Sequence, residues 1–542
     1  MKHLTLLVTL ILTTTLLSAQ LAVTIPGDFE KNNGIVFAWS QQEEENLVIT
    51  EVISLVQQKI DTVWILYQPE LQMDTTTIKQ FLVDHDATTE HIYYIPANYQ
   101  SPLIRNYGPI TGFAAFESNL ERFIYNGVYS NSGANGEDSI PNQLAETWDW
   151  PIADIPLEMD GSNILHDGIK YGFSTTDLIE NNLQYTEDEI RVMLKDKFNL
   201  NNWIFLSPLT NSGGGEHHSI DEFMQILDFE TILVSSYPDT LPDYAVIEQN
   251  VATLESLTNA FGRPYHIIRI PASPGANGSF GINPTDEMRS YTSSILINSQ
   301  IFVPNFGNEF YDSMAMDLYA ESMPGYEFHG IDASYLSQQF FSLKQLTSPF
   351  PQDHYLRIEH SKKLGLQPYQ PEVQITCISK SGELVEEMWL YSKINSEPEY
   401  TKTPVYLVCP EHFGVIEGLI PSDTVHYYLE SISSFSTTTY PLAAPEGNFT
   451  FWMDVVSSTN DAIQEEYSTL YPNPNQGIFN IRLPNDTEKA LFQIFNLNGM
   501  LLHEETVSNY QTIDLRSVVK SGSYIVRLQS DGNDELIKIL IQ

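Results

Sequence analysis

The stretch GIVFAWSQQEEENLVITEVISLVQQKIDTVWILY, residues 34–67, decides the fold class of the first large region of the chain. It predicts a strand at 34–40, a helix near 43–58 and a second strand at 61–67 that is rich in aromatic and β-branched residues. A helix between two such strands indicates an α/β architecture.

The same unit recurs further along the chain. A helix predicted near 243–262 precedes the strand-like segment 264–273, and a helix predicted near 309–322 precedes the segment 325–334. Residues 24–360 therefore read as an internally repeated α/β array. Loops rich in Gly and Asn separate the repeats and can carry a site at one end of a propeller or barrel; they are 130–138, 212–218 and 273–281.

Residues 365–455 change character and contain strand-like segments only, with turn residues between them. This spacing predicts an immunoglobulin- or fibronectin-like β-sandwich. The two cysteines of the chain, Cys377 and Cys409, both fall here. A disulfide is permitted in an exported protein, and a pair of buried free thiols is the alternative, because sequence does not give their separation.

The composition and the N-terminal segment limit which class of protein this can be. The chain of 542 residues has 26 Lys+Arg against 70 Asp+Glu, a net charge of −44, which excludes nucleic acid and anionic membranes as partners. Residues 1–19 read as a secretory signal peptide with Lys2, an apolar run from Leu4 to Leu17, and cleavage after Ala19. No other stretch approaches the roughly 18 apolar residues of a bilayer span, so no transmembrane segment is expected after cleavage.

The last segment, 471–542, has short alternating strands separated by Asn-Pro, Asn-Gly and Ser-Gly turns, which predict a small β-sandwich. Its strings Tyr471-Pro472-Asn473-Pro474, Asn498-Gly499 and Gly522-Ser523-Tyr524 resemble the type A C-terminal sorting domain of the type IX secretion system of Bacteroidetes. The resemblance implies that this secretion machinery is a partner. It also implies that the protein is either released or attached to the outer cell surface.

Several strings in the first region carry a second resemblance. They are Arg105-Asn106-Tyr107-Gly108-Pro109, Asp160-Gly161-Ser162-Asn163, Ile220-Asp221-Glu222-Phe223-Met224, Tyr291-Thr292-Ser293 and Val303-Pro304-Asn305-Phe306-Gly307. They resemble the bacterial (Porphyromonas-type) peptidyl-arginine deiminases and their agmatine deiminase relatives. The resemblance implies a five-bladed ββαβ propeller of the guanidino-group-modifying fold over 20–362, with a site on its axis. An immunoglobulin-like domain (363–455), a polar linker (456–470) and the sorting domain (471–542) would follow.

The reaction of that family defines what its residues must do. Two carboxylates grip the substrate guanidinium, a cysteine thiolate attacks its central carbon, and a histidine acts as acid and base. The resemblance implies that Arg105, Asn163 and Asp221 contact the substrate. It also places Asn106 at the position of one gripping carboxylate, Ser219 at that of the histidine, Ser293 at that of an asparagine and Gln345 at that of the cysteine, with Lys344 where agmatine deiminase-like members often have histidine.

No residue from 1 to 376 is Cys, so no alignment register supplies the nucleophile. The sequence therefore predicts a non-catalytic, exported binding protein, a pseudoenzyme whose ligand is an arginine-containing peptide or a surface protein. One alternative is a hydrolase of altered chemistry that uses Glu216, His217 and His218 with Asp221. The other is an active peptidyl-arginine or agmatine deiminase. No metal site or cofactor is predicted, although acidic loops such as 531–534 would allow calcium without specifying it.

Overall fold

The computed structural model describes residues 23–541 except for 72, 117–118, 130–135, 210–218, 284–285, 288, 409–410, 455–467, 472–474, 484–486, 488, 497–500, 509–510 and 531–532. The predicted signal peptide, most of the predicted linker, half of the acidic loop at 531–534, Glu216, His217, His218 and Cys409 lie outside the described residues. The chain divides into two compact units, Met1–Asp454 and Val455–Gln542.

The stretch at 34–67 folds as expected, with its strand boundaries shifted slightly. It forms β2 (Asn32–Ala38), α1 (Glu43–Val56) and β3 (Thr62–Tyr67), and the two strands pair in parallel. Next to β3 lies β4 (Ile92–Pro96), which follows α2 (Thr75–Asp84). On the other edge, β17 (Ser348–Pro351) pairs antiparallel with β2, so the end of the region closes onto its beginning.

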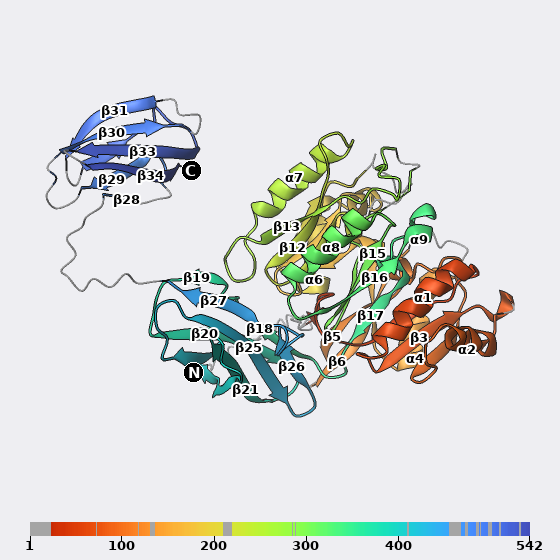
Figure 1. The fold of residues 1–542 in the computed structure, drawn as a ribbon. Coiled ribbons are helices and arrows are strands. Elements are labelled where there is room, and N and C mark those ends of the chain that lie inside the picture. The colour runs from red at the N-terminus through yellow and green to blue at the C-terminus, as the bar shows by residue number, and fades with distance from the viewer. Residues whose placement is uncertain are drawn as a thin grey trace, which may run out of the picture. The chain divides into compact units, whose positions relative to one another are not determined.

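Four further sheets repeat one pattern: an antiparallel strand pair, a helix, and a third strand parallel to the second. In Figure 1, α7 and α8 lie across the strands of their own sheets. The elements are β5 (Ile110–Phe116), β6 (Asn119–Val128), α4 (Ile140–Trp148) and β7 (Ile152–Glu158), with β1 (Val23–Thr24) on the β5 edge; β8 (Leu165–His166), β9 (Tyr171–Thr175), α5 (Asp177–Glu180), α6 (Glu187–Phe198) and β10 (Asn202–Leu206); β11 (Met224–Asp228), β12 (Thr231–Ser236), α7 (Tyr244–Glu255) and β13 (His266–Pro271); β14 (Ile295–Ile297), β15 (Gln300–Asn305), α8 (Glu309–Ser322) and β16 (Glu327–Asp332), followed by α9 (Ser334–Gln338).

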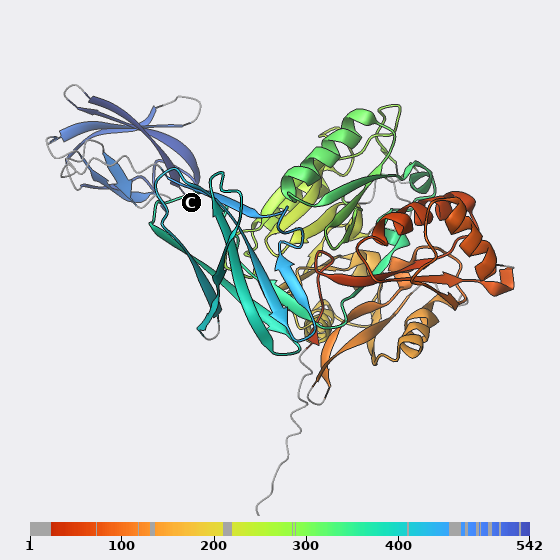
Figure 2. The ribbon, with the colours of Figure 1, turned by 60° about the horizontal axis from the view of Figure 1, so that its bottom comes forward.

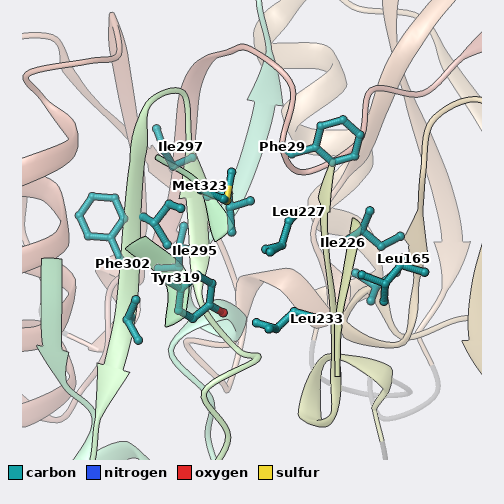
Figure 3. Close-up of a cluster of buried hydrophobic side chains, with 14 of the residues drawn as sticks. Phe29, Leu165, Ile226, Leu227, Leu233, Ile295, Ile297, Phe302, Tyr319 and Met323 are labelled. Carbon is teal, nitrogen blue, oxygen red and sulfur yellow. The ribbon is translucent and has the colours of Figure 1, made fainter. Parts of the chain in front are cut away.

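The expected ββαβ repeat is thus present, but the expected closure into a five-bladed propeller is not confirmed. What the described residues show is a set of separate three- and four-stranded sheets. Apolar side chains from neighbouring repeats fill the space between them. Figure 3 shows part of this core, with Leu227, Leu233, Ile295, Phe302, Tyr319 and Met323 among its members.

The following region is built of strands only, as the sequence predicted, and forms two sheets (Figure 2). One contains β18 (Leu356–Glu359), β20 (Glu372–Ser381), β24 (Glu411–Glu417) and β23 (Tyr406–Val408); the other contains β19 (Gly365–Gln367), β27 (Phe449–Met453), β25 (Thr424–Ser433), β21 (Val385–Ile394) and β22 (Thr401–Pro404), with β26 (Thr437–Tyr440) on β25. Cys377 is a buried free thiol on β20.

The second unit has its own apolar core, which includes Phe479, Phe492 and Val526. Its strands form a three-stranded and a four-stranded sheet, in keeping with the small β-sandwich expected for the tail. They are β28 (Thr469–Tyr471), β29 (Ile478–Arg482) and β32 (Gln511–Asp514), and β31 (Leu501–Ser508), β30 (Lys489–Phe495), β33 (Gly522–Ser530) and β34 (Asn533–Ile541).

Candidate functional site

Four short helical turns carry most of the predicted site residues, and each lies shortly before a strand. They are α3 (Ile104–Tyr107) before β5, η4 (Gly161–Asn163) before β8, η5 (Ile220–Glu222) before β11 and η6 (Lys344–Leu346) before β17. The turn α3 contacts both η4 and η6, and η4 contacts η5. Because the repeats present these turns at equivalent positions, residues more than 200 positions apart meet in one place.

Gly161 is required for this approach. A Cβ atom at this position would lie 2.1 Å from the backbone oxygen of Arg105, well inside van der Waals contact. Any side chain would therefore push η4 away from α3, since the opposing atom belongs to the backbone and cannot rotate aside.

Arg105 connects two carboxylates at the centre of the site. Its Nε donates to Asp221 Oδ2 at 2.8 Å, and its Nη2 donates to Asp28 Oδ2 at 2.9 Å. Charge-assisted bonds of this kind are roughly twice as strong as neutral ones. One of the two guanidinium-gripping groups expected from the sequence is thus bound to an arginine of the same chain.

Lys344 occupies the other side of the same carboxylates. Its Nζ lies 2.8 Å from Asp221 Oδ1, 2.9 Å from Asp28 Oδ2 and 2.5 Å from Gln225 Oε1. An ammonium group has three donors, and here all three have acceptors. Both oxygens of Asp221 therefore contact internal cations, and we call Asp28, Arg105, Asp221 and Lys344 the charge cluster.

The charge cluster is largely withdrawn from water and formally neutral. The side chains of Asp221 and Lys344 are 1% and 3% exposed and that of Arg105 is 10% exposed, while Asp28, beside the cavity, is 28% exposed. Burial disfavours the ionised form of Asp28, but Arg105 and Lys344 outweigh it and hold the pKa of this carboxyl well below its ordinary value. Burial likewise disfavours the charge of Arg105, but Asp221 and Asp28 reverse the effect and raise its pKa.

Three other predicted site residues hold the turns in place. The Ser219 hydroxyl donates to the backbone oxygen of Ser162 at 3.0 Å, and the Ser293 hydroxyl donates to that of Asp221 at 3.1 Å. The Oδ1 atom of Asn163 accepts from the backbone N–H groups of Ile220 and Thr175, at 3.2 and 2.9 Å. These side chains are buried and link η4, η5 and the segment before β14.

The side-chain amides of Asn106 and Gln345 differ in their hydrogen bonding. Gln345 is buried, and its Oε1 accepts from the backbone N–H of Ser342 at 2.9 Å, so its amide stabilises its own turn. Asn106 is also buried, and its Oδ1 has no hydrogen-bond partner among the described residues. Such an atom costs about 1–3 kcal/mol. The amide of Asn106, at the expected carboxylate position, therefore destabilises the folded site.

A cavity of about 80 Å³ reaches the charge cluster from the side of Asp28 and Arg105 and also touches His166. Burial lowers the pKa of His166 to about 4, with Asp28 opposing this shift, so the imidazole is neutral near pH 7. No group of three His, Cys, Asp or Glu side chains suited to a metal ion occurs in the part of the chain that the structure describes.

Sequence reasoning missed two participants, Asp28 and Gln225. Asp28 precedes the first long strand in Pro26-Gly27-Asp28, and nothing local distinguishes it among 70 acidic residues. Gln225 follows the recognised string at 220–224 by one position, on β11. Its place beside Lys344 depends on the contact between repeats. Glu216, His217 and His218, the proposed rescue residues, lie outside the described residues.

Comparisons with known proteins agree with this architecture. The C-terminal residues 469–542 match the family model for the secretion system C-terminal sorting domain, which indicates secretion through the type IX system and attachment to the outer cell surface. Among the described residues, no helix is long and apolar enough to cross a membrane.

Similar proteins point to deiminases. A protein of Vibrio parahaemolyticus provisionally named agmatine deiminase is 26% identical over 222 residues, which cover 38% of this chain and 60% of that protein. One from Legionella pneumophila strain Paris is 29% identical over 92 residues, 17% of this chain and 25% of that protein. The chain thus spans less than two thirds of the curated relatives it matches.

Solved structures share the fold of the first region. A crystal structure provisionally described as a peptidyl-arginine deiminase gives a TM-score of 0.52 at 17% identity, covering 61% of this chain and 99% of that one. The agmatine deiminase of Enterococcus faecalis also gives 0.52, at 14% identity, with 61% and 96% covered. Residues 24–351, well over half of the chain, match the family model itself. The chain therefore belongs to the Porphyromonas-type peptidyl-arginine deiminase family.

Proposed function

We propose that this exported family member is a non-catalytic binding protein. The observation that carries the proposal is the absence of any cysteine before Cys377 in the full sequence. Attack on the guanidinium carbon needs a thiolate or a nucleophile of similar strength. The amide of Gln345 has no ionised form that would serve.

Cys377 does not substitute for the missing nucleophile. It lies on β20 of the sandwich that follows the family region, and it is buried. Burial raises the pKa of this thiol to about 12, so it is protonated at neutral pH. Its surroundings are those of a core residue.

The charge cluster supports the same proposal, because it leaves Asp221 without a free oxygen for a substrate. A substrate guanidinium at Asp221 would have to displace Arg105 or Lys344, whose donors bond to both carboxylate oxygens. The displaced cation would keep only one carboxylate partner, Asp28, which Arg105 and Lys344 both contact. Breaking a buried ion pair in this way costs about 3–5 kcal/mol. We therefore propose that arginine side chains are not ligands of Asp221 and that the binding function uses another surface.

The test is an assay of the full chain with peptidyl-arginine, free arginine and agmatine, measuring ammonia and the ureido product. We expect neither above the buffer control. The Gln345→Cys variant supplies a thiol while Ser219 and the charge cluster stay unchanged, and we expect it to be inactive too. Ureido product from the wild-type chain in proportion to its concentration would overturn the proposal. Turnover by Gln345→Cys alone would show that only the nucleophile is missing.

A further inference from the structure

A second cavity, of about 240 Å³, lies where the β-sandwich meets the family region, and no residue of the charge cluster lines it. The two regions are joined beside it by an ion pair between Lys362 Nζ and Asp228 Oδ2 at 2.6 Å. The backbone N–H of Lys362 also donates to Glu230 Oε2 at 2.8 Å. Ligand pockets occur preferentially at such seams between domains.

The walls of this seam cavity are mainly apolar. Figure 3 shows three of the contributing side chains, Phe29, Leu227 and Met323, among the core residues of the family region. Ile358 and Phe449 come from the sandwich. An apolar cavity of about 150 Å³ is enough to hold benzene, so this one has room for a longer hydrocarbon group.

Most charged groups of the seam cavity already have partners. Arg357 pairs with Glu30 at 3.2 Å and with Glu359 at 2.8 Å, and Lys362 pairs with Asp228. These pairs leave little attraction for a charged ligand.

Lys31 is different. Its Nζ donates to the backbone oxygen of Thr437 at 2.9 Å, and no carboxylate among the described residues lies within ion-pair distance. Burial lowers the pKa of Lys31, although Asp61 opposes the shift. A half-buried ammonium with only a neutral acceptor gains most from an anion that shares its environment.

We propose that the seam cavity binds an apolar monocarboxylate, with the carboxylate against Lys31 and the hydrocarbon chain along the apolar walls. The site is separate from the family site and independent of the proposed loss of catalysis. Glu321 also lines the cavity and opposes the anion, as does the net charge of −44. Neutral apolar ligands would lack the contribution of Lys31.

The experiment titrates the full chain with octanoate, octanol and acetate by calorimetry. We expect octanoate to bind more tightly than octanol, and acetate not to bind because it lacks the apolar chain. Lys31→Gln should weaken octanoate binding about 10- to 100-fold, the worth of one charge-assisted hydrogen bond. Lys31→Arg should retain binding, and Glu321→Gln should tighten it severalfold.

Lys59→Gln is the matched control, because Lys59 pairs with Glu327 and does not line the cavity. It should leave octanoate affinity unchanged. Equal affinity for octanol and octanoate, with no effect of Lys31→Gln, would overturn the proposal. So would the absence of octanoate binding to the wild-type chain.

Discussion

The charge cluster and the core of the β-sandwich both bury polar side chains, but they do so in opposite ways. The cluster places two cations against two carboxylates. The sandwich buries His360, whose Nδ1 lies 2.6 Å from the Thr376 backbone oxygen and whose Nε2 lies 2.8 Å from the Tyr427 hydroxyl. Burial lowers the pKa of His360 to about 4, so this group is neutral near pH 7.

The two regions therefore tolerate different substitutions. A neutral side chain in a core needs hydrogen bonds, and losing them costs about 1 kcal/mol each. A charge in a core needs an opposite charge. When one member of a buried ion pair is removed, the charge that remains destabilises the folded state. The charge cluster should therefore respond strongly to substitution, and the sandwich should respond strongly to pH.

The largest expected effect is that of Lys344→Met. It leaves Asp28 and Asp221 facing Arg105 alone, with an uncompensated buried negative charge. We expect the free energy of unfolding to fall by about 3–5 kcal/mol, measured by chemical denaturation at pH 7. An unchanged unfolding midpoint would mean that the cluster is solvated, against the 1% exposure of Asp221.

The second effect concerns the sandwich. The pKa of His360 is about 4 in the folded state, against about 6.5 for an unfolded histidine. The unfolded state therefore binds more protons between these values, and the stability present above pH 6.5 is lost as the pH falls towards 4. We expect a loss of up to about 3 kcal/mol.

His166 shifts in the same direction, so the wild-type slope contains both histidines. The contribution of His360 is the difference between the pH profiles of the wild-type chain and His360→Gln. Parallel profiles from pH 7 to pH 4 would show that the imidazole of His360 is not buried in its neutral form.

A double-mutant cycle measures the interaction between Asp221 and Lys344 itself. Asp221→Asn and Lys344→Met each leave the charge cluster with one charge in excess, but together they remove both members of a pair at 2.8 Å and restore neutrality. We expect the double variant to lose less stability than the sum of the single variants, with a coupling of about 0.5–3 kcal/mol. Additive losses would indicate that the two groups do not interact.

The smallest effect is expected at the surface. Lys59 pairs with Glu327 at 2.6 Å, but their side chains are 32% and 48% exposed. Lys59→Met should change the free energy of unfolding by less than about 1 kcal/mol. If Lys59→Met lowered the free energy of unfolding as much as Lys344→Met, burial would not determine how much each lysine contributes to stability.

Local patterns predicted the helices and strands of three segments, although the helix expected near 243–262 ends early, as α7 at Glu255. The helix expected at 309–322 is α8 with the same bounds, and the strand expected at 34–40 is β2 shifted by two residues. Three of the strings that carry the family resemblance, at 105–109, 160–163 and 220–224, begin on or next to the turns where the site forms, whereas the string at 303–307 lies at the end of β15. The contact between Asp221 and Lys344 was not predictable, because the two residues lie 123 positions apart in the chain and meet only in the folded protein. Sequence analysis therefore left Asp221 available for a ligand, whereas both its oxygens contact internal cations.

Whether Arg105 and Lys344 occupy Asp221 can be measured by titrating the full chain with an N-acetylated, C-amidated arginine. Calorimetry should detect no binding by the wild-type chain up to about 1 mM, a limit of about −4 kcal/mol. Lys344→Gln, which vacates one side of the carboxylate but keeps an amide, should bind measurably. Tighter binding by the wild-type chain than by Lys344→Gln would show that Asp221 is free for a ligand, because the guanidinium would then be bound while Lys344 is in place.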